Sequence, residues 1–138
     1  MRTLYESLLD IDDVESSIGL IAMIDNWCKD NIEGKYVVDK KTLTINSSSS
    51  IIITNNKLVE FPSCIHFGIV RGAFYCEDCV LLTSLKGAPK EVREGFYCDG
   101  CVLLTSLKGA PKKVGGEFYC NNCTSLKTLE GAPKKSRR

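Results

Sequence analysis

The segment FYCEDC, at residues 74–79, returns as FYCDGC at residues 96–101 and as FYCNNC at residues 118–123. The copies are 22 residues apart, and each continues into a similar stretch that reaches a Gly-Ala-Pro triplet. A fixed period of this length is typical of a solenoid, in which each repeat buries its apolar face against the next. The repeat, rather than any single cysteine pair, therefore has to be explained first.

The order of apolar residues within a repeat predicts a strand, a turn and a return segment. Phe96 and Cys98 are two residues apart, so on a strand they point to one side and Tyr97 points to the other. The Gly-Ala-Pro triplets are typical of turns, because they lack the Lys-Ser/Thr ending of a phosphate-binding loop. We expect the inward-facing set of the second repeat to be Val92, Phe96, Cys98, Cys101, Leu104, Leu107 and Pro111.

The spacing F-x-C-x-x-C-x-x-L resembles leucine-rich repeats, in which Asn or Cys follows the apolar strand positions. A degenerate earlier copy at residues 51–61 places Asn56 at this position. The C-x-x-L-T-S-L continuation looks like the cysteine-containing bacterial class, and the FYC and GAPK segments resemble short bacteriophage members. The V-x-x-x-F spacing departs from L-x-x-L, so we expect the convex side to differ from eukaryotic horseshoes. The expected structural ladder comprises Asn56, Cys76, Cys79, Cys98, Cys101, Cys120 and Cys123.

The expected fold is α+β: a right-handed, leucine-rich-repeat-like β-solenoid of about 3–4 short rungs with an N-terminal helical cap. Residues 1–34 are expected to form an acidic helical cap, with an amphipathic helix over residues 14–31 and a shorter helical segment before it. We assign residues 35–50 to two capping strands and a serine turn, residues 51–133 to the repeat array, and residues 134–138 to a basic tail.

Charge is unevenly distributed along the chain. The net charge is +1, but residues 1–33 carry −6 and residues 108–138 carry +6. Such asymmetry suits head-to-tail association or a solubilising tail. It equally suits nucleic-acid binding through Lys90, Lys112, Lys134 and the final KKSRR, which we keep as an alternative function.

The paired cysteines also suggest zinc. Cys76, Cys79, Cys98 and Cys101 match the spacing of a zinc ribbon, so a zinc-stabilised structural module remains an alternative. A structural zinc takes four ligands, however, whereas the repeats hold six cysteines in equal pairs. A solenoid also explains the repeated Phe, Leu, Gly and Pro, so we favour it and expect no metal or cofactor.

Neither redox chemistry nor another enzymatic activity is expected. A reactive C-x-x-C pair usually opens a helix, whereas these pairs follow predicted strands. His66 is the single histidine and has no catalytic partner in the sequence around it. The acidic N-terminal stretch does not resemble a signal peptide, and no apolar run approaches the ~20 residues of a membrane span. We therefore expect a cytoplasmic, reducing location and no membrane association; the bacteriophage resemblance implies the host cytoplasm.

The leading functional hypothesis is a protein–protein interaction module that binds through a strand-lined tyrosine face. Alternation on the strands also predicts outward positions for Ile52, Thr54, Ala73, Gly95 and Glu117. The alternative is a purely structural role, in which the stacked tyrosines only stabilise the sheet. The bacteriophage resemblance implies a host defence or regulatory protein as the partner. The third repeat is followed only by KKSRR, so we expect self-association at its edge or protection of that edge by charge. The candidate partner-binding residues are Tyr75, Tyr97, Tyr119, Glu77, Asp99 and Asn121.

Overall fold

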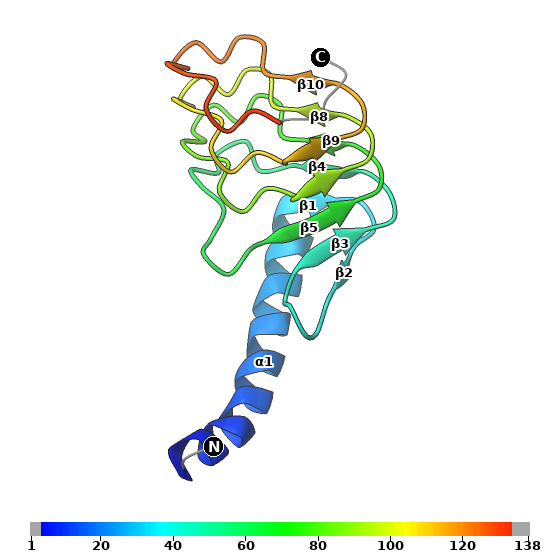
Figure 1. The fold of residues 1–138 in the computed structure, drawn as a ribbon, viewed down its shortest axis with the longest axis vertical. Helices are drawn as coiled ribbons and strands as arrows, with labels where there is room; N and C mark the ends of the chain where they lie inside the picture. Colours follow the sequence, from blue (N-terminus) through cyan, green and yellow to red (C-terminus); the bar gives the residue numbers. More distant parts are fainter. Residues whose placement is uncertain (1–3, 134–138) are drawn as a thin grey trace.

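The chain folds as one long helix followed by a β-solenoid of short strands (Figure 1). The computed structural model describes residues 4–133, and the side chains of residues 18–133. Helix α1 spans Leu4–Asn31. The strands are β1 (Ile32–Glu33), β2 (Val37–Val38), β3 (Ile45–Ser47), β4 (Ile51–Ile53), β5 (Phe67–Val70), β6 (Phe74–Tyr75), β7 (Glu91–Val92), β8 (Phe96–Tyr97), β9 (Lys113–Val114) and β10 (Phe118–Tyr119). The predicted α+β solenoid with a helical cap is confirmed.

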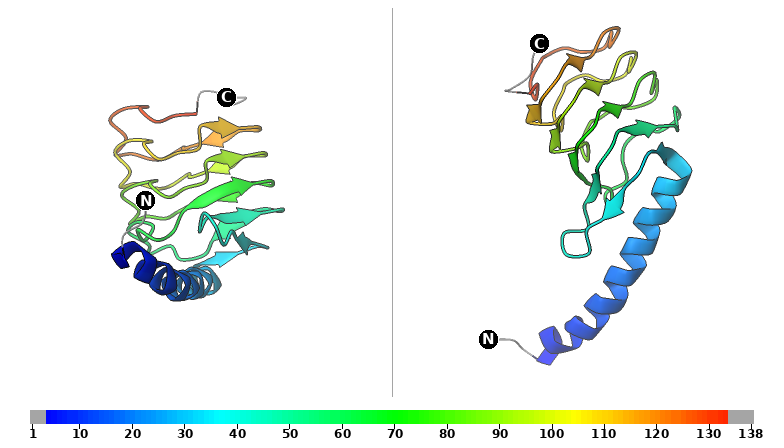
Figure 2. Two further views of the ribbon diagram at one scale, coloured as in Figure 1. Left: turned by 60° about the horizontal axis from the view of Figure 1, so that its bottom comes forward. Right: turned by 90° about the vertical axis from the view of Figure 1, so that its right-hand side faces the viewer.

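Each repeat contributes two strands rather than the single strand predicted from FYC. One sheet has the order β1-β4-β6-β8-β10 and contains the tyrosines; the other has the order β2-β3-β5-β7-β9 and contains the valines. Val92 pairs with Val70 and Val114, while Phe96 pairs with Phe74 and Phe118. The three residues between valine and phenylalanine form the corner between the sheets, which accounts for the V-x-x-x-F spacing. Figure 2 shows the resulting stack of rungs.

The parallel ladder begins earlier than the predicted boundary at residue 51. β3 already pairs in parallel with β5, whereas β2 pairs antiparallel with β3 and β1 antiparallel with β4. The serine tract between β3 and β4 is a turn, as predicted, and the Ser50 hydroxyl accepts a hydrogen bond from the Ala73 amide at 2.9 Å. The antiparallel strands β1 and β2 therefore cap the solenoid at its N-terminal end.

The interior of the solenoid consists of like residues stacked on one another. Phe96 is fully buried, and its ring centroid lies 5.4 Å from that of Phe74 and 5.2 Å from that of Phe118. Identical rings stack because the strands pair in register about 4.8 Å apart. The inward-facing set predicted for the second repeat is buried: Val92, Phe96, Cys98, Cys101, Leu104, Leu107 and Pro111.

Helix α1 is a single helix of 28 residues rather than two helical segments. Only its C-terminal turns cover the solenoid, where Ile24 and Cys28 are buried and the Trp27 ring meets those of Phe61 and Phe67 at centroid distances of 6.2 and 6.4 Å. The N-terminal part projects away from the sheets (Figures 1 and 2). About the last two turns of the helix therefore contribute to the cap, together with β1 and β2.

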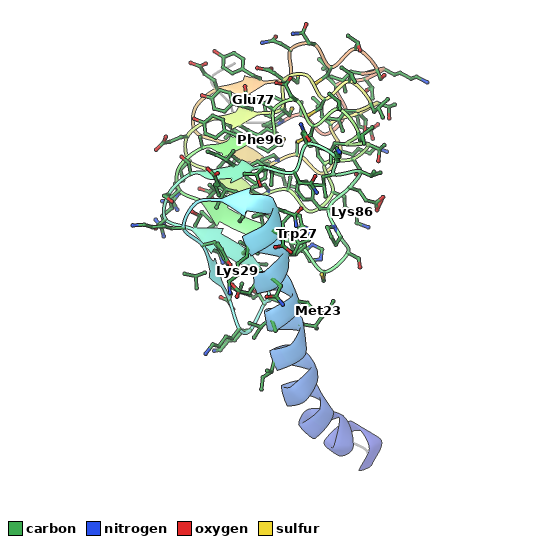
Figure 3. All side chains as sticks on the ribbon, turned by 180° about the vertical axis from the view of Figure 1, so that it is seen from behind. Met23, Trp27, Lys29, Glu77, Lys86 and Phe96 are labelled. Carbon is green, nitrogen blue, oxygen red and sulfur yellow. The ribbon has the colours of Figure 1, made fainter. Side chains whose placement is uncertain are left out.

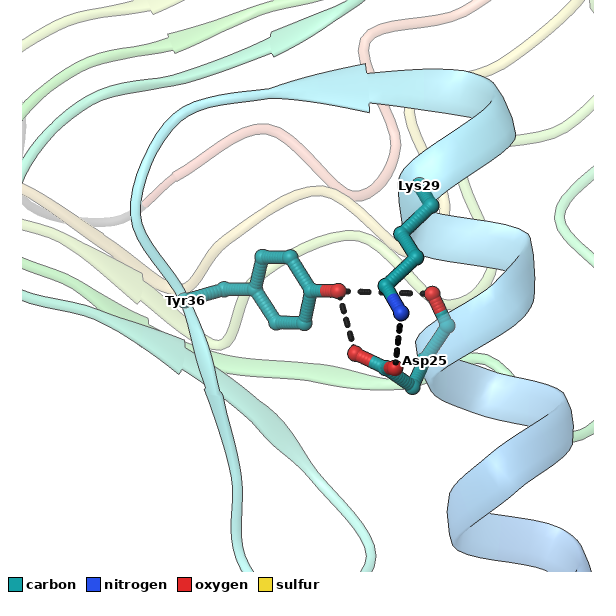
Figure 4. A network of polar contacts seen from close by, with 3 residues as sticks. All are labelled: Asp25, Lys29 and Tyr36. Carbon is teal, nitrogen blue, oxygen red and sulfur yellow. Dashed lines mark hydrogen bonds and ion pairs between the residues drawn. The ribbon is translucent and has the colours of Figure 1, made fainter.

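A polar network fixes the helix to the segment between β1 and β2 (Figure 4). The Tyr36 hydroxyl donates to the Asp25 carboxylate, and the Lys29 ammonium lies 3.0 Å from the other carboxylate oxygen. The hydrogen bond from Tyr36 and the one from Lys29 hold the pKa of Asp25 below its ordinary value. The contact of Asp25 with Tyr36 thus joins α1 to the segment between β1 and β2.

The position of a phenylalanine in the stack should decide how much it contributes to stability. Phe96→Ala should lower the free energy of unfolding by about 3–5 kcal/mol, because it removes a fully buried ring between two others. Phe118→Ala, the matched change on a half-buried ring of the last rung, should cost distinctly less. Urea unfolding followed by circular dichroism measures both, and equal losses would contradict the stacked core.

Candidate functional site

The most regular surface feature of the molecule is a column of three stacked tyrosines. Tyr75, Tyr97 and Tyr119 lie on β6, β8 and β10 in register. Neighbouring ring centroids are 4.8 and 5.3 Å apart, with interplanar angles of 7° and 30°. All three side chains are half-buried, so each presents part of its ring to solvent. We refer to these residues as the tyrosine column.

The rings lie close to the backbone of their own strands. A Cβ added to Gly95 would come within 2.6 Å of the Tyr97 hydroxyl oxygen, so this ring covers Gly95. The corresponding residue below Tyr75 is Ala73, which is 3% exposed. The prediction that Ala73 and Gly95 are outward surface residues is therefore wrong. The small residues Ala73 and Gly95 leave room for Tyr75 and Tyr97 to lie against the sheet, whereas Glu117 occupies the corresponding position beside Tyr119.

Carboxylates surround the column. Glu77 is exposed and Asp99 half-buried beside the tyrosines, and Asp99 accepts a hydrogen bond from the Asn121 amide at 2.6 Å. Burial raises the pKa of Tyr97, and the charges of Tyr75, Glu117, Glu77 and Glu94 raise it further. The structure thus brings the six predicted partner-binding residues together on one side of the solenoid.

The face continues beyond the tyrosines toward the helix. Ile52 pairs with Tyr75 and Glu33 pairs with Ile52, so both extend the same column across β4 and β1. Ile52 is 42% exposed. In Figure 3, Glu77 lies on this strand side, Lys86 on the opposite loop side, and Phe96 within the stack.

The cysteines are part of the ladder between rungs. The Cys101 thiol donates to the Cys76 carbonyl and the Cys123 thiol to the Cys98 carbonyl, each at 3.1 Å. Hydrogen bonds with Cys101 and Cys98, together with complete burial, raise the pKa of Cys76 well above its ordinary value. A small thiol, which is a weak donor, thus serves a buried backbone carbonyl.

The two residues between paired cysteines form a turn with a left-handed backbone position. Asp78, Gly100 and Asn122 have φ values of 56°, 76° and 60°. Gly adopts this region freely, and Asp and Asn adopt it more readily than other residues, which explains the differing letters of CEDC, CDGC and CNNC. Each repeated FYCxxC segment therefore folds as a short strand followed by a tight turn.

The predicted ladder position of Asn56 is wrong by one residue. Asn56 is exposed, whereas the Asn55 carbonyl accepts from the Leu58 amide as Cys79 accepts from Leu82. The Asn55 side chain also donates to the side-chain oxygen of Asn31 at 2.9 Å, at the end of α1. The sequence alignment missed this shift because the loop of the degenerate copy differs in length from the others.

A groove of about 860 Å³ runs over the Gly-Ala-Pro turns on the loop side of the solenoid. This groove was not predicted from the sequence. Gly109 has a φ of 93°, and an added Cβ would lie 2.6 Å from the backbone of Leu85, so glycine is required where the turns pack on one another. Lys108 on its rim lies 3.4 Å from the Glu130 carboxylate. The lining residues are Ala88, Pro89, Lys90, Lys108, Gly109, Ala110, Lys112, Glu130, Gly131 and Ala132.

Comparison with known proteins adds no relative: the chain matches no protein-family model, no curated protein and no solved structure. Within residues 4–133, no helix is long and apolar enough to cross a membrane. Across the same described part of the chain, no three His, Cys, Asp or Glu side chains are grouped as metal ligands. Lys134 and the basic tail lie outside the described residues.

Burial should separate the cysteines by reactivity. Cys64 and Cys120 are half-buried, whereas the other six are buried. Burial raises the pKa of Cys28 to about 12, which leaves almost no reactive thiolate near neutral pH. Hydrogen bonds with neighbouring cysteines instead lower the pKa of Cys98 to about 6 and of Cys101 to about 4, so burial protects these two thiols by excluding the reagent. Iodoacetamide at pH 8 should therefore label Cys64 and Cys120 first and the rest only after unfolding, as read by peptide mass spectrometry. Early labelling of Cys76 or Cys101 would show that the ladder opens.

The zinc alternative has a separate test. Since Cys101 and Cys123 already donate to backbone carbonyls, we expect the fold to persist in excess EDTA and the purified protein to hold no stoichiometric zinc. Elemental analysis and circular dichroism measure the two quantities. About one zinc per chain, together with unfolding on chelation, would support the zinc-stabilised module instead.

Proposed function

We propose that the protein is a non-enzymatic protein–protein interaction module whose binding centre is the tyrosine column. The observation that carries this proposal is the in-register stack, with ring centroids 4.8 and 5.3 Å apart on neighbouring strands of one sheet. Tyrosine combines a large contact area with few rotatable bonds, which makes it a frequent residue of binding surfaces. Here the rings are already ordered by their neighbours, so binding requires little further ordering.

The surroundings of the column indicate a partner with cationic groups. Stacking covers the ring faces between rungs, so a partner would contact ring edges and hydroxyl groups. Glu77 and Asp99 lie beside these edges and would pair with lysine or arginine side chains of the partner. Ile52 would add apolar contact at the end nearest the helix.

We extend the proposal to the class and setting of the protein. The cysteine ladder and the C-x-x-L-T-S-L segments support a leucine-rich-repeat protein of the cysteine-containing, bacteriophage type, in which two parallel sheets replace the single sheet of the horseshoes. Its setting would be the reducing cytoplasm of a bacterial host. The partner would then be a host defence or regulatory protein. This extension rests on the sequence resemblance.

A second candidate is nucleic-acid binding on the loop side. The groove over the Gly-Ala-Pro turns favours it, because Lys90 and Lys112 flank the groove on successive rungs. Phosphate binding by these lysines would weaken steeply with rising salt. Binding through the tyrosine column would bury a large apolar area, so its affinity should depend much less on salt concentration.

Substitution of the central tyrosine tests the proposal. With the partner captured by the wild-type protein, Tyr97→Ala should weaken binding by roughly thirtyfold or more, because a central aromatic residue of this kind is worth about 2 kcal/mol. Tyr97→Phe keeps the stacked ring and should retain most of the affinity. Isothermal titration calorimetry measures both, with circular dichroism as the check on folding.

Lys112→Ala is the matched control on the loop side and should leave partner affinity unchanged. Normal binding by Tyr97→Ala combined with loss of binding by Lys112→Ala would move the site to the groove. If Tyr97→Ala binds normally and only its unfolding free energy falls, the column serves the sheet alone.

A further inference from the structure

The last rung of the solenoid exposes residues that are buried in the rung before it. Leu129 is 68% exposed, whereas the equivalent Leu107 is 1% exposed. Phe118, Cys120 and Leu126 are likewise half-exposed, although their counterparts Phe96, Cys98 and Leu104 are fully buried. This end of the stack is therefore an apolar surface. We call it the terminal face and define it as Phe118, Cys120, Leu126 and Leu129.

The C-terminal segment that contains the terminal face is basic. Lys113 and Lys127 are exposed on the last rung, where Glu130 pairs with Lys108 at 3.4 Å. By sequence, residues 108–138 carry a net charge of +6, so two such segments brought together would repel each other. A symmetric contact between the C-terminal ends of two copies is therefore disfavoured, and a partner that is both apolar and acidic fits better.

The projecting part of helix α1 has these two properties. The N-terminal part of the helix leaves the solenoid (Figure 2). Ile18 of this helix is 63% exposed. The sequence places Leu4, Ile11 and Ile18 seven residues apart, with Leu8 and Val14 between them at helical spacing. Residues 1–33 carry a net charge of −6, so two of these helices would also repel each other. A short helical segment without tertiary contacts is marginal in water, which favours a partner for it.

The same helix already shows how such a contact works. Its C-terminal turns cover the N-terminal end of the solenoid by packing Ile24, Trp27 and Cys28 against the first rungs. The sequence of its N-terminal turns has apolar residues at helical spacing, and the backbone of these turns projects away from the rungs of its own chain (Figure 1). The terminal face is an exposed rung end that lacks such a cover within residues 4–133.

We propose that the N-terminal half of α1 of one copy packs on the terminal face of a second copy, giving head-to-tail self-association. Apolar contact between the helix residues around Ile18 and the terminal face would supply the affinity. The charges of −6 and +6 would orient the two copies. This association is independent of the tyrosine column, which lies on the side of the solenoid rather than at its ends.

The test is sedimentation velocity of the full chain over a range of concentrations. The wild type should associate, and the association should weaken between about 0.05 and 0.5 M salt because the charges are screened. Ile18→Gln and Leu129→Gln should each raise the dissociation constant by about tenfold or more. Val37→Gln is the matched control, since Val37 is 70% exposed but belongs to β2. Circular dichroism verifies that every variant keeps the helix and the solenoid.

Mixing the two impaired variants distinguishes head-to-tail packing from symmetric packing. The Leu129→Gln chain keeps an intact helix and the Ile18→Gln chain keeps an intact terminal face, so their mixture should form a one-to-one dimer with near wild-type affinity. A symmetric helix–helix contact would be lost only in Ile18→Gln, and a symmetric end-to-end contact only in Leu129→Gln. Either result, a wild type that stays monomeric, or a mixture without dimer would overturn the proposal.

Discussion

The in-register pairing of parallel strands is the constraint on which the rest of this molecule depends. Each residue of a rung lies directly over its counterpart 22 residues away. Each side chain must therefore pack against the equivalent side chain of the neighbouring rung. Flat rings satisfy this condition by stacking, as Phe74, Phe96 and Phe118 do inside the solenoid and the tyrosine column does outside. The interior and the candidate binding face are thus two consequences of one geometric repeat.

Cysteine and glycine occupy the positions where this repeat leaves least room. The thiols of Cys101 and Cys123 each reach a carbonyl of the preceding rung at 3.1 Å, which ties successive turns together in a buried place. Gly95 and Gly109 lie where a ring or a backbone comes within 2.6 Å of a hypothetical Cβ. Because each repeat has two cysteines at the same spacing, the sequence resembles a set of metal ligands. In the structure these cysteine pairs flank turns instead.

A solenoid presents different chemistry on its sides and at its ends. On the sides, repetition turns a single residue into a column, so the tyrosine column and the lysine-lined groove lie on different sides of the stack. At the ends repetition stops, and residues equivalent to buried ones become exposed, as Leu129 shows beside Leu107. Helix α1 covers the first rungs at the N-terminal end of the solenoid only. The proposed partner face and the proposed self-association face therefore have separate physical origins and can operate at the same time.

The sequence by itself determined the features that depend on period and alternation. The 22-residue spacing predicted the solenoid, and the two-residue alternation of FYC predicted buried Phe96 and Cys98 with Tyr97 on the outer side. Only the tertiary structure decided the second sheet, because a two-residue strand such as Glu91–Val92 has no alternation of its own and is stabilised by its neighbours on other rungs. It likewise decided the shift from Asn56 to Asn55, since loop length hides the register. The projection of α1 was also decided by the tertiary structure, since only the packing of Ile24, Trp27 and Cys28 shows which turns of the helix cover the solenoid. Covering of Gly95 by Tyr97 also became visible only in three dimensions, because strand alternation specifies a side of the sheet and not where a long side chain comes to rest.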